Sequence, residues 1–411
     1  MPASRGNNLL KVKQQNTESI KAWIYRAGPL SRIELADCLG LTPATITNII
    51  GELVAQGLVQ ELPEEAAPGA SRGVGRKPIL MDFVPGARLA LGISLGRDST
   101  HYAVTELRGK VLLQGCEPVM PDDFEGMTAR LLALTHRLKR QQPALWRRLL
   151  GIGLVMPGIV DTYAGTVKNI DHARAGWQGQ PLAKLLADAT GLPVRMENNV
   201  RARTRAVMLF HPEIVRSCST FALCHVSWGI ACPIVLRNDS YSGEDAAAGE
   251  IGHMVMEKDG ALVDGCGRPG SLESFSSTRA ILARCRQPLA ERKDTILAKI
   301  CANPLSPTLE EVLLAAEKQD PFVCAQIRQA ITYLGIALSN IIDFLNPRLL
   351  ILSGPLFRVP ANFSLLCQIV RQYTFSTEAE DIRLVYTDLG EYGGALGAAA
   401  ACLEKYFICS D

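Results

Sequence analysis

The sequence SRIELADCLGLTPATITNIIGEL occupies residues 31–53 and decides the fold of the N-terminal part. Ser31 and Glu34 have the spacing of a capping box, so we expect one helix to begin there and to end at Gly40. Thr42 suits the cap of a second helix, and Pro43 suits its first turn. Two short helices joined by a glycine turn are typical of a helix-turn-helix. We expect these side chains to face inward: Ile33, Leu35, Ala36, Leu39, Ile46, Ile49, Ile50 and Leu53.

The flanking segments extend this motif into a winged helix-turn-helix. Residues 18–24 have helical spacing and stop at Gly28-Pro29, and residues 57–61 predict the strand of a wing. The outer face of the second helix is small and polar, so it can approach base edges closely. A small helical bundle without DNA binding is the alternative, because this helix carries no Arg or Lys. The candidate DNA contacts are Arg32, Thr42, Pro43, Ala44, Thr45, Thr47 and Asn48.

A basic segment follows a Pro-, Glu- and Ala-rich stretch over residues 63–70. It has the sequence SRGVGRKP, residues 71–78, with Arg72, Arg76 and Lys77 spaced by glycine and closed by proline. Such a segment can lie in a narrow A·T minor groove, where the negative potential attracts guanidinium groups. A solvated basic linker is the alternative. We favour a minor-groove hook because the segment adjoins a helix-turn-helix.

Composition restricts the protein class without deciding it. The 411 residues include 47% hydrophobic ones and have a formal net charge of +2, so any DNA-binding prediction depends on local motifs. The polar N-terminus lacks the apolar core of a signal peptide, and no apolar run reaches the length of a membrane span. We therefore expect a cytoplasmic protein without membrane insertion. The twelve cysteines form no CxxC pair and are expected to be mostly buried apolar residues.

From residue 88 onward, strands and helices alternate, which predicts an α/β fold. The ordered motifs are LGISLGRDS (91–99), GIGLVMPGIVD (151–161), ENNVRA (197–202), AAGEIGH (247–253), GCGRPGSLE (265–273), ILSGP (351–355) and GGALGAAAA (393–401). In this order and spacing the chain resembles the ROK family (repressor, open reading frame, kinase), and in particular its glucose- and N-acetylglucosamine-responsive repressors. The resemblance implies an actin-like ATPase fold with two α/β lobes and a sugar cleft.

The resemblance also implies that kinase activity is lost. Family kinases open with an Asp-Leu-Gly-Gly-Thr phosphate loop, which here is Ser94-Leu95-Gly96-Arg97-Asp98. Their second phosphate loop has become Trp228-Gly229-Ile230-Ala231-Cys232-Pro233, which has fewer glycines to cradle a phosphate. Their catalytic Asp corresponds to Asn199, and an amide cannot serve as the general base. We predict that the chain is not an enzyme.

The sugar-binding positions of the family are kept, whereas its zinc site is not. Candidate ligand-binding residues are Asn198, Asn199, Glu250, His253 and Glu273, a set of directional donors and acceptors that suits sugar hydroxyls. Of the zinc positions, His253 and Cys266 remain good ligands, Asp264 is an acceptable one and Ser271 a poor one. We therefore expect no cofactor, with zinc loss favoured over zinc retention.

The sequence predicts a regulator that binds double-stranded operator DNA as a homodimer or homotetramer and responds to a sugar or sugar phosphate. The alternatives are an active ATP-dependent sugar kinase with a DNA-binding domain, and a regulator controlled by a protein partner. The expected domains are a winged helix-turn-helix at 1–70, a basic linker at 71–84, a first lobe at 85–200 plus 388–411, and a second lobe at 201–387 that holds the sugar site and the dimerisation surface.

Overall fold

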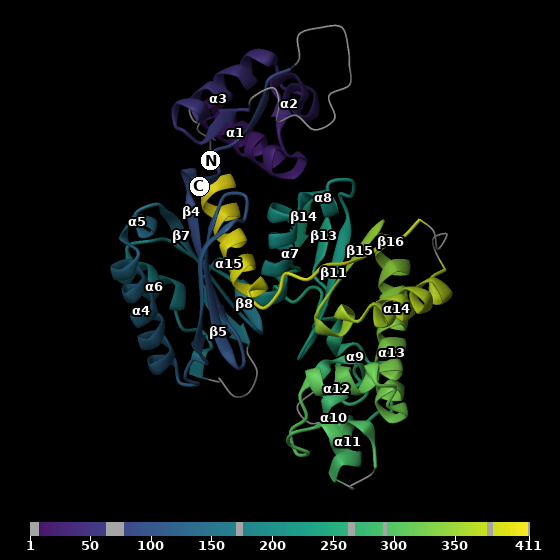
Figure 1. The fold of residues 1–411 in the computed structure, drawn as a ribbon. Coiled ribbons are helices and arrows are strands. Elements are labelled where there is room, and N and C mark those ends of the chain that lie inside the picture. The colour runs from purple at the N-terminus through teal and green to yellow at the C-terminus, as the bar shows by residue number, and fades with distance from the viewer. Residues whose placement is uncertain are drawn as a thin grey trace, which may run out of the picture. The chain divides into compact units, whose positions relative to one another are not determined.

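The computed structural model describes residues 8–62, 78–169, 176–261, 268–290, 294–375 and 381–409. The chain divides into two compact units (Figure 1). One unit comprises Met1–Ser217 and Gly390–Asp411, and the other comprises Cys218–Leu389. The lobe boundary therefore lies after residue 217 rather than after residue 200 as predicted, because the helix that follows Asn198 packs on the first unit.

The N-terminal part of the first unit is a winged helix. It contains α1 (Asn8–Ala27), α2 (Arg32–Leu39) and α3 (Pro43–Ala55), together with a sheet of β1 (Leu30–Ser31), β3 (Leu80–Phe83) and β2 (Val59–Glu61) in that order. The predicted wing strand at 57–61 is confirmed by β2. The linker predicted at 71–84 is wrong at its C-terminal end, because β3 pairs with β2 through contacts such as Val59 with Phe83.

Local capping explains where the helices of the winged helix begin. Ser31 Oγ accepts from the Glu34 amide at 3.2 Å and Glu34 Oε2 accepts from the Ser31 amide at 2.8 Å, which confirms the predicted capping box. Thr42 caps α3 as predicted. The prediction for Ile33 was wrong: its side chain is 69% exposed. It precedes Leu35 by two residues, which places the two side chains on opposite faces of a helix.

The first lobe is built on a five-stranded sheet in the order β10-β7-β4-β5-β6. The strands are β4 (Leu89–Leu95), β5 (Ser99–Glu106), β6 (Val111–Pro118), β7 (Leu149–Met156) and β10 (Val194–Asn198), and β8 (Ile159–Asp161) and β9 (Thr166–Asn169) form a separate hairpin. One face is covered by α4 (Phe124–Gln141) and α6 (Leu182–Thr190), and the other by α7 (Asn199–Phe210) and α15 (Gly393–Leu403) (Figure 1). Short elements are η2 (Pro85–Ala87), α5 (Pro143–Trp146), α8 (Pro212–Val215) and η6 (Glu404–Ile408).

Helix α15 lies unusually close to the sheet because glycines replace side chains at the contact. A Cβ atom on Gly92 would lie 1.9 Å from the Ala395 carbonyl oxygen, and one on Gly153 would lie 1.8 Å from the Ala398 carbonyl oxygen. The alternate strand residues, such as Leu91 and Ile93, pack into the apolar core on the α4 side. Helix α15 thus belongs to the first unit, although it lies close to the C-terminal end of the chain.

The second unit holds a six-stranded sheet, mostly in the order β14-β13-β11-β15-β16 with β12 beside β11. Its strands are β11 (Phe221–Val226), β12 (Ile230–Ala231), β13 (Ile234–Leu236), β14 (Asp239–Tyr241), β15 (Leu349–Ser353) and β16 (Arg383–Tyr386). Its helices are η4 (Ile251–His253), α9 (Leu272–Ser276), α10 (Thr278–Ala290), α11 (Ile296–Ile300), α12 (Leu309–Glu317), α13 (Pro321–Leu345), η5 (Pro355–Arg358) and α14 (Pro360–Tyr373).

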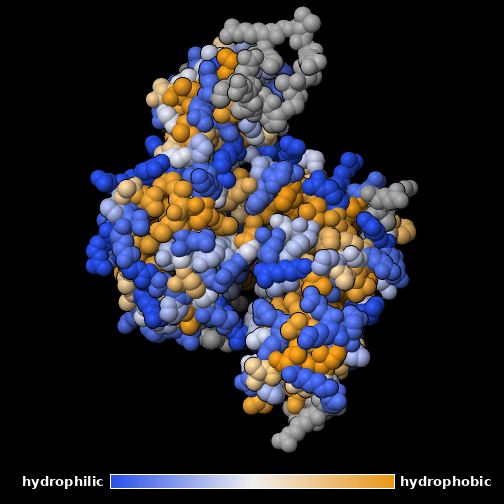
Figure 2. Space-filling view, in the orientation of Figure 1, coloured by the Kyte–Doolittle hydropathy of each residue, from blue (hydrophilic) through white to orange (hydrophobic). Residues whose placement is uncertain are grey.

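The surface of the second unit mixes polar and apolar side chains. In Figure 2 apolar residues gather over the segment that contains α10 to α12, where Leu305 is 77% exposed and Leu314 is 42% exposed. None of the described helices combines the length and the apolar character that crossing a membrane requires.

Candidate DNA-binding and effector sites

Helix α3 presents a small, uncharged face to solvent. Pro43, Ala44, Thr47 and Asn48 are exposed, while Ile46, Ile49, Ile50 and Leu53 are buried as predicted. Thr45 is half-buried, and its hydroxyl lies 2.9 Å from the Thr42 hydroxyl, so these two side chains stabilise the first turn of α3. The exposed methyl and amide groups have the chemistry to contact a thymine methyl and an adenine edge.

The remaining predicted DNA contacts are charged residues. Arg32 is half-buried, and its guanidinium donates to Glu61 Oε1 at 3.1 Å, which joins the start of α2 to the end of β2. Arg72, Arg76 and Lys77 lie outside the described residues. The winged helix over residues 8–62 contains five basic and five acidic residues, so this stretch has no net charge to attract phosphates.

The predicted ligand residues of the first lobe lie where β10 meets α7. The Asn198 side chain is the N-cap of α7: its oxygen accepts from the Val200 amide at 2.9 Å and the Arg201 amide at 3.1 Å. Its nitrogen donates to the Gly158 carbonyl at 2.8 Å. Asn198 therefore fixes the backbone, and the half-buried Asn199 is the first residue of the helix.

Buried charged side chains also lie at this junction between β10 and α7. Glu197 is 1% exposed and forms ion pairs with Arg201 at 3.8 Å and Arg205 at 3.4 Å. Burial lowers the pKa of Arg205, while the Glu197 carboxylate opposes that shift. A buried carboxylate shared by two guanidinium groups holds the start of α7 in a fixed place. Glu197 and Asn198 thus position Asn199, a structural arrangement that the motif alone did not reveal.

Residues 94–98, predicted to correspond to the family's first phosphate loop, include a tight hairpin turn. Ser94 pairs with His101 across β4 and β5, and the Gly96 amide donates to the Ser99 carbonyl at 3.0 Å. A Cβ atom on Gly394 would lie 2.3 Å from Ser94 Oγ, so the start of α15 packs directly on this side chain. The turn ends with Arg97 and Asp98, which face each other at 3.7 Å at the surface.

In the second unit the predicted sugar residues converge on one turn. Glu273 Oε1 accepts from the Ile230 amide at 2.8 Å. Cβ atoms on Gly229 and Gly252 would lie 2.8 and 2.7 Å from the same oxygen, so two glycines make room for this carboxylate. Glu250 is half-buried at the start of η4, and His253 is exposed at its end. The structure therefore gathers Glu250, His253 and Glu273 around η4, α9 and β12.

Residues 228–233, predicted to correspond to the family's second phosphate loop, adjoin this turn. The Thr278 amide donates to the Ser227 carbonyl at 2.8 Å, which ties the start of α10 to the loop. The Arg279 guanidinium lies 5.3 Å from the centre of the Trp228 ring, a distance that suits a cation–π contact. This pairing was not predicted, although the bulky Trp228 at the start of the segment was a signal for it.

The predicted zinc residues divide between described and undescribed parts of the chain. Asp264 and Cys266 lie outside the described residues. Ser271 is fully buried at the N-cap position of α9, and its hydroxyl lies 3.1 Å from the Ser274 hydroxyl. Among the residues that the structure describes, no three His, Cys, Asp or Glu side chains gather to form a metal site. A serine committed to a neighbouring hydroxyl does not fit a tetrahedral zinc site.

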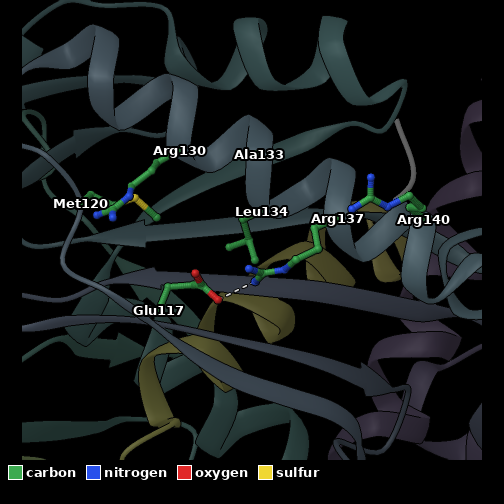
Figure 3. A pocket seen from close by; sticks show the side chains of 7 residues that line it. All are labelled: Glu117, Met120, Arg130, Ala133, Leu134, Arg137 and Arg140. Atoms are coloured by element: carbon green, nitrogen blue, oxygen red, sulfur yellow. Dashed lines mark hydrogen bonds and ion pairs between the residues drawn. The ribbon is translucent and has the colours of Figure 1, made fainter.

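A separate hollow of about 330 Å³ lies on the α4 side of the first lobe (Figure 3). Arg137 forms an ion pair with Glu117 across it, and Arg130 donates to the Val119 carbonyl at 2.9 Å. Ser94 and α15 lie on the opposite face of the same sheet, as the alternation along β4 requires. The hollow is therefore distinct from the residues predicted to bind a sugar.

A family model described as the ROK family matches residues 90–405. The chain belongs to the ROK family. A second model, described as the MarR family, matches residues 22–72, which include α2, α3 and β2 of the winged helix. The resemblance and the α/β fold predicted from the sequence are thereby confirmed.

Individual ROK proteins resemble the chain over most of its length. The xylose repressor of Caldicellulosiruptor bescii is 26% identical, over 97% of this chain and 98% of that protein. The N-acetylglucosamine repressor of Escherichia coli O6:H1 is 26% identical, over 84% of this chain and 82% of that protein. The crystal structure of a ROK family transcriptional regulator, a homologue of E. coli MLC, has a TM-score of 0.79 and 26% identity, and the match covers 96% of this chain and 97% of that one.

Proposed function

We propose that this ROK protein is a transcriptional repressor of sugar genes whose affinity for operator DNA changes when a sugar binds. The observation that carries the proposal is the exposed, uncharged face of α3 on a chain that resembles repressors over nearly its whole length. Pro43, Ala44, Thr47 and Asn48 would contact base edges in the major groove, and Thr42 and Thr45 would hold the start of the helix. Arg72, Arg76 and Lys77 would enter the minor groove.

The effector is a sugar or a sugar derivative. Glu273, His253 and Glu250 supply carboxylate and imidazole groups around η4, and such groups bind vicinal hydroxyls directionally. Asn199 stays a candidate ligand-binding residue of the first unit, and Asn198 would act by holding Asn199 in place. The relatives' names include xylose and N-acetylglucosamine, which makes these two sugars the first to test.

The same protein does not phosphorylate its sugar. Asn199 stands where the family's kinases have their general base, and an amide cannot take a proton from the attacking hydroxyl. Ser94 is packed against α15 and Trp228 against Arg279, so both replaced positions have internal contacts instead of open loops. A coupled assay for ADP should detect no sugar-dependent turnover, and turnover abolished by Asn199→Ala would contradict this part of the proposal.

The repressor would act in the cytoplasm as a homodimer or homotetramer. A single helix-turn-helix contacts one half-site, and two copies related by a twofold axis bind a palindrome. A sugar could change operator affinity only if it bound one arrangement of the assembly more tightly than another. Analytical ultracentrifugation with and without operator DNA measures the number of copies, and a complex containing a single chain would contradict the dimer.

The decisive experiment measures operator affinity with and without sugars. Selection of bound fragments from random DNA would supply the operator, and fluorescence anisotropy would then follow binding with xylose, N-acetylglucosamine, glucose and their phosphates. We expect one of them to change the Kd by at least about tenfold. His253→Ala should remove this response, whereas the matched surface variant His136→Ala should keep it. Unchanged affinity with every sugar would refute effector control.

A further inference from the structure

Arg108 of the first lobe reaches into the winged helix. It lies in the turn between β5 and β6, where the Gly109 amide donates to the Glu106 carbonyl at 3.0 Å. Its guanidinium donates to the Ile24 carbonyl at 3.1 Å and to the Tyr25 carbonyl at 3.4 Å, and it forms an ion pair with Asp82. One side chain of the lobe thus contacts both α1 and β3 of the winged helix.

The Ile24 and Tyr25 carbonyls lie in the last turn of α1, where backbone carbonyls have no hydrogen-bond partner within the helix. The last four carbonyls of an α-helix have no partner within the helix, and α1 ends at Ala27. A cation at this end also interacts favourably with the helix dipole. Arg108 is 21% exposed and Asp82 is 19% exposed, so solvent screens their ion pair only in part. Arg108 therefore acts as the C-terminal cap of α1, although it belongs to another part of the chain.

A second contact lies beside it. Lys21 of α1 is 7% exposed, and its ammonium donates to the Phe407 carbonyl at 2.7 Å. The ring of Phe407 lies 5.2 Å from that of Phe83 and 6.2 Å from that of Tyr25, centre to centre. Three aromatic rings, from α1, β3 and η6, thus form one apolar cluster between the winged helix and the C-terminal segment.

This contact combines favourable and unfavourable groups. Burial lowers the pKa of Lys21, opposed by the charges of Glu18 and Cys409. The Tyr25 hydroxyl is buried and makes no hydrogen bond to the described residues. Burying the Tyr25 hydroxyl without a partner opposes docking, and so does the desolvation of the Lys21 ammonium. The hydrogen bond from Lys21 to the Phe407 carbonyl, the aromatic cluster and Arg108 favour docking, so removing Lys21 or Arg108 should weaken the contact.

The C-terminal helix α15 links this contact to the Ser94 end of the first-lobe sheet. Helix α15 begins at Gly393 and Gly394, beside Ser94, and continues directly into η6, which carries Phe407. Its backbone contacts the glycines of β4 and β7 without intervening side chains, so the helix cannot tilt without moving the sheet. A shift at the Ser94 end would therefore reach Phe407 through one rigid element.

We propose that Arg108 is a positioning residue that fixes the winged helix on the first lobe, with Lys21 and Phe407 as the second contact. The inference rests on the proposed function, since it assumes that the winged helix is the DNA-binding part. Loss of Arg108 should free the winged helix from the lobe without changing the face of α3. DNA binding would then persist, but the spacing between two half-sites would no longer be selected.

Distances between spin labels test the docking without DNA. Cys38 on α2 and Cys116 on β6 are both exposed, so the distance between spin labels at these positions reports how the winged helix lies on the lobe. In a full-length chain with its other reactive cysteines replaced by serine, we expect one narrow distance distribution. Arg108→Ala and Lys21→Met should each broaden it, and Arg108→Lys should have a smaller effect. Arg130→Ala, a matched change on α4, should leave it unchanged.

Operators with two or five extra base pairs between the half-sites provide the second measurement. The wild type should bind them at least about tenfold more weakly than the native operator, and Arg108→Ala should reduce this ratio to about threefold or less. Unfolding by heat checks that the variants are folded. An unchanged label distribution in the Arg108→Ala, Lys21→Met double variant would overturn the inference. Failure of the wild type to bind any operator would refute the proposed function instead, because the label distances do not depend on DNA.

Discussion

Replacing Asn198 by alanine separates a structural role from a ligand-binding role. The side chain accepts from two amides at the start of α7 and donates to the Gly158 carbonyl. Loss of an Asn cap costs about 1 kcal/mol, and the part-buried Gly158 carbonyl without its donor costs about 1 to 2 kcal/mol more. We therefore expect Asn198→Ala to lower the free energy of unfolding by about 2 to 3 kcal/mol, which corresponds to roughly 4 to 12 °C in Tm.

The neighbouring position supplies the matched control. Asn199 is half-buried and follows the cap, so Asn199→Ala should change the free energy of unfolding by less than about 0.5 kcal/mol. Asn198→Ser keeps an acceptor for the helix amides and should recover about half of the loss. Urea unfolding followed by circular dichroism measures all three variants. Equal stability of Asn198→Ala and Asn199→Ala would refute the capping argument.

Three further variants test other contacts. Thr42→Ala removes the cap of α3 and should cost about 1 kcal/mol in thermal unfolding, and Thr42→Ser should restore it. Gly153→Ala places a Cβ atom 1.8 Å from the Ala398 carbonyl and should destabilise the fold by at least about 2 kcal/mol, whereas Gly176→Ala, which has open space, should not. The Ala164 amide, with the Tyr163 amide and Lys168, lowers the pKa of Asp161. The ionised Asp161 carboxylate therefore stabilises the fold at pH values above the pKa that this group has in the unfolded chain. The wild type should lose this stabilisation as the pH falls below about 4, whereas Asp161→Asn should lack it at every pH. A pH series of melting temperatures measures that difference.

The parts of the fold that could be predicted are those with a local cause. Ser31 and Thr42 begin two helices through side chains that accept from amides three residues later, and Gly40 ends the first of them in a left-handed backbone conformation. Their pattern is therefore visible in the sequence. The first ten residues of α1 were not predicted, because most of them are polar, and Leu10 and Val12 are exposed and do not form an apolar stripe. Strand β3 was missed because it has only four residues and pairs with a strand that lies far away in the sequence.

The site was predictable in residue type but not in role. The family motif indicates Asn198 and Asn199 equally, and only the hydrogen bonds distinguish the cap from its neighbour. Asn before a helix is itself a capping signal, which could have indicated this role. Arg108 gave no signal, because its acceptors are backbone carbonyls 83 and 84 residues earlier. A contact between a charged turn and a distant helix end follows from tertiary packing alone.

We expect α3 and the basic segment over residues 71–78 to contribute differently to DNA binding: α3 contacts bases, and the basic segment contacts phosphates. Residues 8–62 contain as many acidic as basic residues, so affinity for phosphates should come largely from Arg72, Arg76 and Lys77. Each phosphate contact contributes about 0.9 to the slope of log affinity against log salt. Arg76→Ala should reduce that slope by about this amount and weaken binding most on A·T-rich flanks.

Asn48→Ala should do the opposite: it should leave the salt slope unchanged and reduce discrimination between operator variants by about 1 to 3 kcal/mol at one base pair. Anisotropy titrations between 50 and 200 mM salt, roughly the range in which counterion release is measured, would separate the two effects. If both variants lost affinity equally on every sequence, with the same change in slope, base contacts and phosphate contacts would not be divided in this way. The uncharged face of α3 would then have to serve general affinity, which its lack of cations makes physically implausible.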